Sequence, residues 1–323
     1  MPVIVASEEA HPFLPSLGSG SAIERGRALH QDIRPLEIAI LNLMADKITT
    51  ERQLAAWLGS TPLQVSLTFV ATDAYVRAVR NGHKSRNTPA EHIVKFYNPL
   101  SDIRDSKFDG LIVTGVNALQ PRVSDEAFWP EVQEIFKWSA DHVFSSLYLC
   151  WGAKAALKHF HDVESIKGER KTSGLFHHRV LADRTGLLFG FPDEFSAPVS
   201  RWKNPDRQAI AKRPGLEALA VSEETGPNIL VESESFGEAG RRFPRRVYVL
   251  NHPEYETETL GAEYLRDRAV DPSTPPPLHY FPDDDPTKPP VNCWRHTAQI
   301  YANWVKLVYE ATPYDRAQIP NPS

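Results

Sequence analysis

The sequence predicts an α/β fold, namely a doubly wound, mostly parallel sheet between two helical layers, a three-layer sandwich. Short and nearly continuous apolar runs such as Leu36–Met44 are typical of strands that are buried on both faces. Segments with helical spacing alternate with these runs through the first half of the chain, and this alternation indicates a parallel sheet. With 323 residues, 41% of them hydrophobic, the chain can form a substantial core.

The elements of the first half follow one another as strand and helix. The predicted strands are Leu36–Met44, Leu63–Val70, Phe108–Gly115 and Val143–Cys150. The predicted helices between and after them are Thr49–Gly59, Asn87–Tyr97, Ala127–His142 and Trp151–Phe160. Strands that alternate with helices in this way form parallel units whose carboxyl ends meet at one edge of the sheet.

The second half is more broken. Its predicted elements are strands at Val180–Leu181, Ile229–Val231 and Val247–Asn251, a helix over Thr257–Ala269 and a final helix over Trp294–Glu310. A segment rich in proline and aspartate, residues 272–291, excludes a helix or a central strand. It is either a linker to the final helix or a loop that Tyr280 and Phe281 hold on the surface of the domain. We expect an arm over residues 1–30, one catalytic domain over 31–315 and a tail over 316–323.

Composition excludes several classes of function. The net charge of -5 argues against a surface that binds nucleic acid, because such surfaces gather lysine and arginine. The apolar runs are too short to cross a membrane, and the N-terminus lacks the pattern of a signal peptide. Two cysteines make no disulfide framework, and no group of His and Cys has the spacing of a metal site. We therefore expect a cytoplasmic protein without a metal, and we expect Cys293 to be structural.

Cys150 is the candidate nucleophile. It ends a predicted buried strand directly before a predicted helix, and such a corner exposes its central side chain at the carboxyl edge of the sheet. The N-terminus of a helix favours a thiolate over a thiol and offers N–H groups to an oxyanion. The alternative is a buried and inert cysteine, which is common for this residue type.

A nucleophilic thiol needs a base, and the segment Val247–Tyr255 supplies one. A strand pattern runs into His252, Pro253 ends the strand, and Glu254 follows. Residues 252 and 254 can point to the same side of an extended chain, so that Glu254 can orient the imidazole. His252 reaches Cys150 if their strands are near neighbours. The alternative is an ordinary surface histidine at a turn.

Several spaced blocks, in this order, resemble the homoserine O-acyltransferase family, which includes homoserine O-succinyltransferases and O-acetyltransferases with a catalytic cysteine. They are His30–Leu36, Ile40–Met44, Gly59–Val65, Asn87–His92, Phe108–Gly115, Cys150–Trp151, Asn251–Tyr255 and Tyr280–Pro286. The resemblance implies a flavodoxin-like sandwich of the class I glutamine amidotransferase type. It also implies a reaction in which an acyl-CoA co-substrate acylates Cys150 before the acyl group passes to a hydroxyl, with no bound cofactor. The partners would be small-molecule substrates and a second copy in a homodimer.

Further residues carry over from the family one at a time. Lys47 matches a family lysine near the active site, although a solvated lysine at the start of a helix is the alternative. Arg201 and Arg266 match arginines expected near the carboxylate of the amino-acid substrate, where a bidentate guanidinium suits the task. For Arg266 the alternative is a surface ion pair with Glu263 or Asp267. Trp151, next to the nucleophile, is expected in the substrate site.

The chain departs from the family pattern around the site. In the segment Val116–Arg122, Leu119 falls at the position that helps to choose between acetyl and succinyl, and Arg122 replaces a family glutamate. Leu119 leaves little room for a succinyl tail and favours acetyl, whereas Arg122 could pair with a succinyl carboxylate. Lys154 replaces a glutamine after the nucleophile. We therefore expect that the acyl donor or the hydroxyl acceptor differs from the usual pair of the family. Serine is one candidate acceptor.

Two other classes of function remain open at this point. A hydrolase or an amidotransferase-like enzyme could use the same Cys150, His252 and Glu254 without acyl-CoA. A ligand-binding relative could have lost activity through the altered segment, although the intact candidate triad argues against this.

Overall fold

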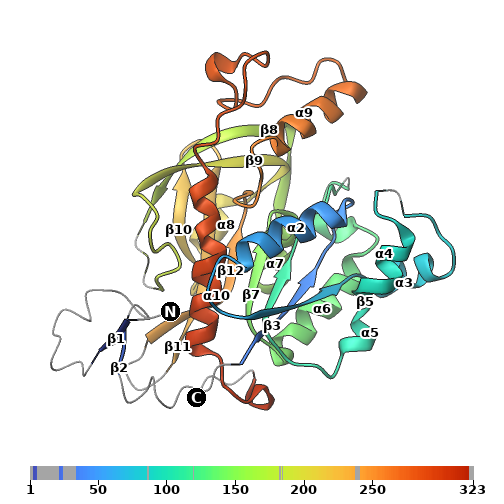
Figure 1. The fold of residues 1–323 in the computed structure, drawn as a ribbon. Coiled ribbons are helices and arrows are strands. Elements are labelled where there is room, and N and C mark those ends of the chain that lie inside the picture. The colour runs from blue at the N-terminus through green and yellow to red at the C-terminus, as the bar shows by residue number, and fades with distance from the viewer. Residues whose placement is uncertain are drawn as a thin grey trace.

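The computed structural model describes residues 34–85, 87–118, 120–181, 183, 185–236 and 241–319, together with the backbone of 3–5 and 22–24. In this part of the chain ten strands form one sheet in the order β5-β4-β3-β6-β7-β12-β11-β10-β8-β9 (Figure 1). Its parallel strands are β3 (Leu36–Leu41), β4 (Val65–Val70), β5 (Tyr97–Asn98), β6 (Phe108–Val113), β7 (Val143–Leu149) and β12 (Arg241–Val249). The order β4-β3-β6-β7-β12 is the flavodoxin-like winding. The predicted doubly wound, mostly parallel sheet is confirmed.

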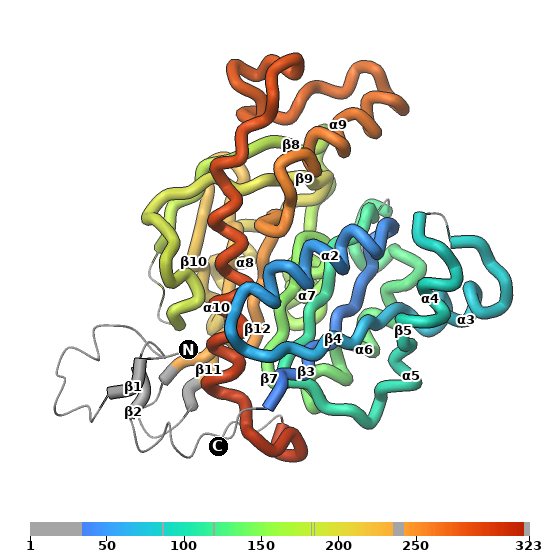
Figure 2. The backbone as a smooth tube through the Cα atoms, viewed as in Figure 1, coloured from blue at the N-terminus to red at the C-terminus, as the bar shows by residue number. Residues whose placement is uncertain are grey.

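An antiparallel extension continues the sheet beyond β12. It consists of β8 (Ser165–Val180), β9 (Glu194–Pro205), β10 (Glu217–Ser222) and β11 (Gly226–Phe236). Figure 2 follows the chain from the blue and green parallel half into this yellow extension. The chain then returns through β12, which pairs parallel with β7 on one side and antiparallel with β11 on the other. As a result, β7 and β12 are neighbours although the whole extension separates them in the sequence.

Helices cover both faces of the sheet (Figure 1). They are α2 (Lys47–Leu58), α3 (Asp73–Arg80), α4 (Ala90–Phe96), α5 (Leu100–Ile103), α6 (Trp129–His142), α7 (Trp151–His161), α8 (Arg207–Ala211), α9 (Thr259–Val270) and α10 (Gln299–Ala311). Successive residues of β3 alternate between the two core layers, as strand geometry requires. Ile38 and Ile40 pack in the layer with α2 and α10, whereas Ala39 and Leu41 pack in the layer with α6 and α7. Both faces are therefore apolar, which explains the continuous apolar run in the sequence.

The extension is where the sequence prediction fell short. The predicted strand Val180–Leu181 touches only the last residue of β8, because the polar run before it gives no apolar signal. β9 was not predicted from the sequence, and it contains Pro198. Proline is tolerated there because β9 is the edge strand of the sheet. α3 was also missed, although Asp73 in its first turn and Arg80 in its last turn complement the helix dipole.

The segment rich in proline is held on the domain surface, so the linker interpretation is wrong. Tyr280 is fully buried and Phe281 is nearly so, and both join a small core layer with Trp294 and Tyr264 of α9. The Tyr280 hydroxyl donates to the backbone oxygen of Thr257 and accepts from Gly261 N at 3.1 Å. The loop thereby fixes α9 against the rest of the molecule.

The termini add little to the described fold. β1 (Val3–Val5) pairs parallel with β2 (Ala22–Glu24), and the rest of the predicted arm lies outside the described residues. Near the other end, Ile319 is buried in the layer with α2 and α10. Of the helices in the described part of the chain, none combines the length and the apolarity required to cross a lipid bilayer.

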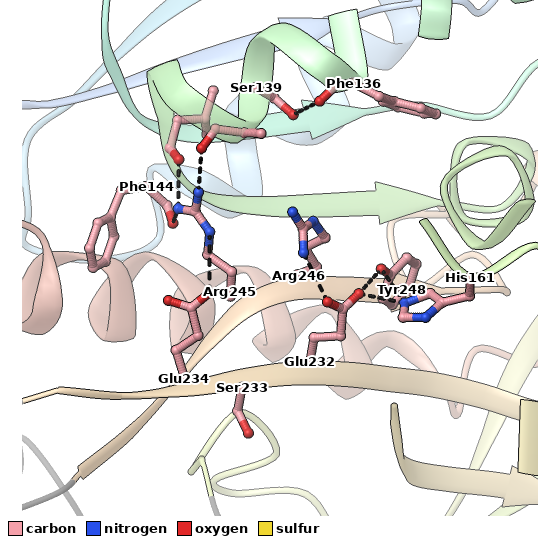
Figure 3. Close-up of polar contacts among 12 residues, drawn as sticks. Phe136, Ser139, Phe144, His161, Glu232, Ser233, Glu234, Arg245, Arg246 and Tyr248 are labelled. Carbon is pink, nitrogen blue, oxygen red and sulfur yellow. Dashed lines mark hydrogen bonds and ion pairs between the residues drawn. The ribbon is translucent and has the colours of Figure 1, made fainter. Parts of the chain in front are cut away.

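A partly buried polar network joins the two parts of the sheet (Figure 3). Glu232 of β11 accepts from Arg246 Nη1 of β12 at 2.8 Å and from His161 Nε2 of α7 at 2.6 Å, and the Tyr248 hydroxyl donates to the same carboxylate. Although burial raises the pKa of Glu232, the contacts with His161, Tyr248 and Arg246 lower it to about 2. The ionised form of Glu232 therefore stabilises the folded protein.

We expect Glu232→Gln to lower the free energy of unfolding by about 2 kcal/mol at neutral pH, since Arg246 loses the charged partner of a partly buried hydrogen bond. The folded pKa lies below the ordinary value, so this contribution is complete above about pH 4.5. It is lost as the pH falls toward 2, and urea unfolding over that range should show the variant and the wild type converging.

Glu234→Gln is the matched control, because Glu234 lies two residues away on β11 and its side chain is 46% exposed. Its ion pair with Arg245 spans 3.7 Å, so the variant should change the stability by no more than about 0.5 kcal/mol. Equal effects of the two substitutions at neutral pH would contradict the role given to Glu232.

Candidate active site

Cys150 lies at a strained corner between β7 and α7. Its backbone has φ 45 and ψ -105, a conformation that non-glycine residues rarely adopt. β7 ends at Leu149 and α7 begins at Trp151, so Cys150 is the turn between strand and helix, as predicted. Cys150 N donates to Val249 O of β12 at 2.8 Å, which ties the corner to the neighbouring strand. This geometry is that of a nucleophile elbow at the carboxyl edge of the sheet.

His252 reaches the same edge because β12 is the parallel neighbour of β7. A methyl group at Gly115 would lie 3.8 Å from both Cys150 Sγ and His252 Cε1, so the two side chains border one small space. His252 Nδ1 contacts Glu254 Oε1 at 2.8 Å, and burial leaves both side chains less than 10% exposed. Glu254 therefore orients the imidazole, whose other nitrogen stays available to the thiol or the substrate.

Two tyrosines that the sequence prediction missed fix this pair. Tyr301 of α10 donates its hydroxyl to Glu254 Oε2 at 3.1 Å. The ring of Tyr255 stacks on His252 with a centroid distance of 4.2 Å and an angle of 20° between planes. Tyr255 in turn donates to Glu263 Oε1 of α9 at 2.6 Å. In the sequence, Tyr255 belongs to the block that contains His252, but Tyr301 could not be distinguished from the other core aromatics of the last helix.

The charges of the site favour a thiolate. Burial raises the pKa of Cys150, but the positive charges of Lys154 and His252 lower it to about 6. Lys154 Nζ lies 3.8 Å from the sulfur. Burial lowers the pKa of His252, whereas Cys150 and Glu254 raise it to about 10. At neutral pH the thiol and the imidazole therefore form a thiolate–imidazolium pair that titrates jointly.

We expect the ultraviolet absorbance of the Cys150 thiolate to titrate with a midpoint near pH 6. An ordinary thiol titrates at about pH 8.5. The signal is the difference between the wild type and Cys150→Ala. Lys154→Met should move the midpoint upward, because it removes a cation 3.8 Å from the sulfur. A wild-type midpoint near that of an ordinary thiol would contradict this electrostatic account.

The other predicted residues are placed as follows. Lys47 is buried at the carboxyl end of β3, where its Nζ donates to the backbone oxygens of Asn42 and Met44 at 2.5 Å and 3.1 Å. It is thus not a solvated lysine, and burial lowers its pKa to about 8. Trp151 is buried against Phe128, and its indole N–H has no acceptor among the described residues.

Two predicted arginines differ in availability. Arg201 is buried, and four of its five N–H groups donate to protein oxygens, those of Asn204, Leu250, Asn251 and Thr225. Arg266 of α9 is 56% exposed and pairs with Asp267 at 2.7 Å. Arg266 follows Glu263, the acceptor of the Tyr255 hydroxyl, by one helical turn of α9.

The segment expected to select the acyl group is only partly described. Arg122 is exposed and directly precedes a short 3-10 helix, Val123–Asp125. Leu119 lies outside the described residues. Gln120 N donates to Glu126 Oε1 at 2.9 Å, which fastens this segment to the end of the short helix. Cys293 is an exposed free thiol rather than a packed structural residue.

Among the residues that the structure describes, no three side chains of His, Cys, Asp or Glu gather in a way that could hold a metal ion. The Cys150–His252–Glu254 arrangement instead fits nucleophilic catalysis, in which a thiolate forms a covalent intermediate and an imidazole moves the proton.

The fold and the site together define an α/β enzyme with a Cys–His–Glu constellation at the carboxyl edge of its sheet. The structure is similar to that of a Thermoplasma acidophilum protein described as part of a GMP synthase, with a TM-score of 0.51 and 14% identity. The match covers 86% of this chain and 96% of that chain. At this identity the likeness concerns the fold alone, and it agrees with the predicted α/β sandwich.

Sequence comparison identifies the family. A family model described as homoserine O-succinyltransferase matches residues 4–314. A relative from Chelativorans sp. (strain BNC1), named homoserine O-acetyltransferase, is 41% identical over 300 residues, 93% of this chain and 91% of the relative. One of the same name from Cereibacter sphaeroides is 42% identical over 294 residues, 91% of each chain. The chain belongs to the homoserine O-succinyltransferase family, whose members are acyltransferases, as the sequence blocks predicted.

Proposed function

We propose that this protein is a homoserine O-acyltransferase of methionine biosynthesis that works by a ping-pong mechanism through a thioester on Cys150. The observation that carries the proposal is the strained Cys150 beside the His252–Glu254 pair in a chain of this family. A low thiol pKa supports the nucleophilic role, because the thiolate exists before the substrate binds.

In the first half-reaction the Cys150 thiolate attacks the carbonyl carbon of an acyl-CoA. The new bond joins Cys150 Sγ to the acyl carbon, and the bond between that carbon and the sulfur of CoA breaks. His252, protonated in the resting pair, gives its proton to the departing thiolate of CoA. The first N–H groups of α7 lack acceptors within the helix and can donate to the oxyanion.

In the second half-reaction the hydroxyl of the acceptor attacks the thioester carbon. His252, now neutral, takes the hydroxyl proton while Glu254 holds the imidazole in position through Nδ1. An ester bond forms, the bond to Cys150 Sγ breaks, and the thiolate–imidazolium pair is restored. No bound cofactor is needed, because the acyl group is supplied by the co-substrate.

The finer assignments belong to this proposal. Acetyl is favoured over succinyl by the size of Leu119, and the names of the relatives support this preference. Arg266 would hold the carboxylate of the acceptor, which is homoserine or its shorter analogue serine. Lys47, Arg201 and Trp151 would shape the substrate site, and Arg122 would influence the choice of acyl group. We also propose a cytoplasmic homodimer that acts on small molecules.

The test is a matrix of acetyl-CoA and succinyl-CoA against homoserine and serine, followed by the release of free CoA. Without an acceptor, intact-mass measurement should find one acyl group on Cys150. Adding the correct acceptor should remove that acyl group and restore turnover. A wild-type protein that releases no CoA with any of these pairs, or that hydrolyses esters and amides without CoA, would refute the proposal.

A further inference from the structure

Lys154 is a buried lysine whose side chain contacts the sulfur of the candidate nucleophile. It lies on α7 four residues after Cys150, and Lys154 N donates to Cys150 O at 3.1 Å in the first turn of that helix. The side chain points back toward the start of the helix, so its Nζ lies 3.8 Å from Cys150 Sγ and donates to it. Because Lys154 is only 3% exposed, its ammonium group is held beside the sulfur.

The partner of Lys154 is not the usual partner of a covered lysine. Lys171 of β8 forms ion pairs with two carboxylates of α9, and Lys203 of β9 lies 3.6 Å from a carboxylate oxygen of Glu126. In the described ranges no carboxylate forms an ion pair with Lys154, and the acceptor of its Nζ is Cys150 Sγ. A buried cation without a counter-ion is costly, so the thiolate of Cys150 is the counter-ion of this lysine.

The other charged groups around the sulfur have partners or tasks of their own. His252 and Glu254 form the pair that moves the proton. Arg201 already donates four of its N–H groups to protein oxygens. Lys203 acts on Lys154 through its charge alone and is paired as described above. Lys154 is therefore a cation that contacts the sulfur and takes no part in the proton transfer.

In the proposed first half-reaction the ammonium group of Lys154 has two opposing effects. It raises the fraction of Cys150 that is thiolate, because it contacts the charged form of the sulfur. It also makes each thiolate less nucleophilic, since negative charge leaves the sulfur as the bond to the acyl carbon forms. At a pH where the thiol is fully ionised, Lys154 therefore slows the attack or leaves it unchanged.

In the proposed second half-reaction the effect has one direction. The sulfur of the thioester is neutral before the acceptor oxygen bonds to the acyl carbon. The bond from that carbon to Cys150 Sγ then breaks, and its electron pair stays on the sulfur. Negative charge thus develops 3.8 Å from an ammonium group, so the contact is stronger in the transition state than in the acyl-enzyme. Lys154 keeps its own proton, and the hydroxyl proton goes to His252.

We infer that Lys154 is a further catalytic residue, which stabilises the leaving sulfur of Cys150 when the acyl group passes to the acceptor. The inference rests on the proposed thioester mechanism and assigns Lys154 to its transfer step. The family pattern has a glutamine at this position, whose amide can donate a hydrogen bond but carries no charge. The cation beside the sulfur is thus a departure of this chain from that pattern.

The test compares the two half-reactions in the wild type and in Lys154→Gln, both at about pH 9.5, where an ordinary thiol is also mostly ionised. Release of CoA from acetyl-CoA without an acceptor should keep its rate or become faster. Transfer of the acetyl group from the preformed acyl-enzyme to homoserine should slow by about tenfold or more, as expected for the loss of a charged hydrogen bond. Intact-mass measurement during turnover should then find more acylated Cys150 than in the wild type.

Lys158→Gln is the matched control for this substitution. Lys158 lies one turn further along α7 and pairs with Asp162 and Glu164. Its replacement should leave both half-reactions within about twofold of the wild type. Lys154→Arg should recover much of the transfer rate, because it restores the positive charge. Lys154→Met, which has a similar length and no charge, takes the place of the glutamine variant if that variant does not fold.

The outcomes separate this inference from the proposed function. Slower transfer with undiminished release of CoA supports the catalytic role of Lys154. An unchanged transfer rate in Lys154→Gln, or an equal loss in both half-reactions, would overturn it. A wild-type protein that forms no acyl adduct on Cys150 would instead count against the proposed function.

Discussion

Cys150→Ala should lower kcat by about 10⁴-fold or more and abolish the acyl adduct, while the protein stays folded. The loss is this large because the thiolate forms the covalent bond on which both half-reactions depend. The alanine variant also removes a buried charge from a strained position, so the free energy of unfolding should not fall. Steady-state release of CoA, intact-mass measurement and urea unfolding together check the three expectations.

Cys293→Ala is the matched control for this prediction. Cys293 is the second cysteine, and it is an exposed free thiol outside the site. Its replacement should leave kcat within about twofold of the wild type, as for most exposed positions. An acyl adduct that persists in Cys150→Ala but disappears in Cys293→Ala would show that the wrong thiol has been given the nucleophilic role.

The sequence was enough to predict the positions of Cys150 and His252 in the candidate site, because each of them follows a strand. Cys150 follows a strand signal that is buried on both faces, and His252 follows the apolar end of another. Their proximity could not be predicted from these signals, since it depends on β7 and β12 being neighbours. The chain between them forms an antiparallel extension with polar and proline-containing strands, which left few of the usual signals for strand order.

The supporting residues were harder to predict for a different physical reason. Tyr255 and Tyr301 act through the direction of a side chain, and that direction follows from strand register and helix rotation. Lys47 is likewise buried at the start of α2, although it lies in a polar stretch of the sequence. In a sequence, a lysine in a polar stretch most often indicates a solvated face. The burial and direction of such side chains were therefore visible only in three dimensions.

Gly152→Ala should have the largest effect of any substitution that adds a single methyl group near the site. The new Cβ would lie 2.5 Å from Val113 O and 2.9 Å from Thr114 O, both backbone atoms that cannot rotate away. α7 would have to move off β6, which should cost about 1–3 kcal/mol of stability, as overpacking does. Because α7 begins at the residue after Cys150, the same movement displaces the thiol, and a shift of about 1 Å can lower kcat by 10²-fold.

Gly115→Ala is the matched comparison variant, since it adds the same methyl group on the other side of the thiol. Its Cβ would meet side-chain atoms, Cys150 Cβ at 3.3 Å and His252 Cε1 at 3.8 Å, so the fold should keep its stability within about 1 kcal/mol. The methyl group would instead fill space in front of the thiol and slow acylation. Urea unfolding and single-turnover acylation distinguish the two variants. If Gly152→Ala were as stable as Gly115→Ala, the close contact between α7 and β6 would not be what holds Cys150 in its strained conformation.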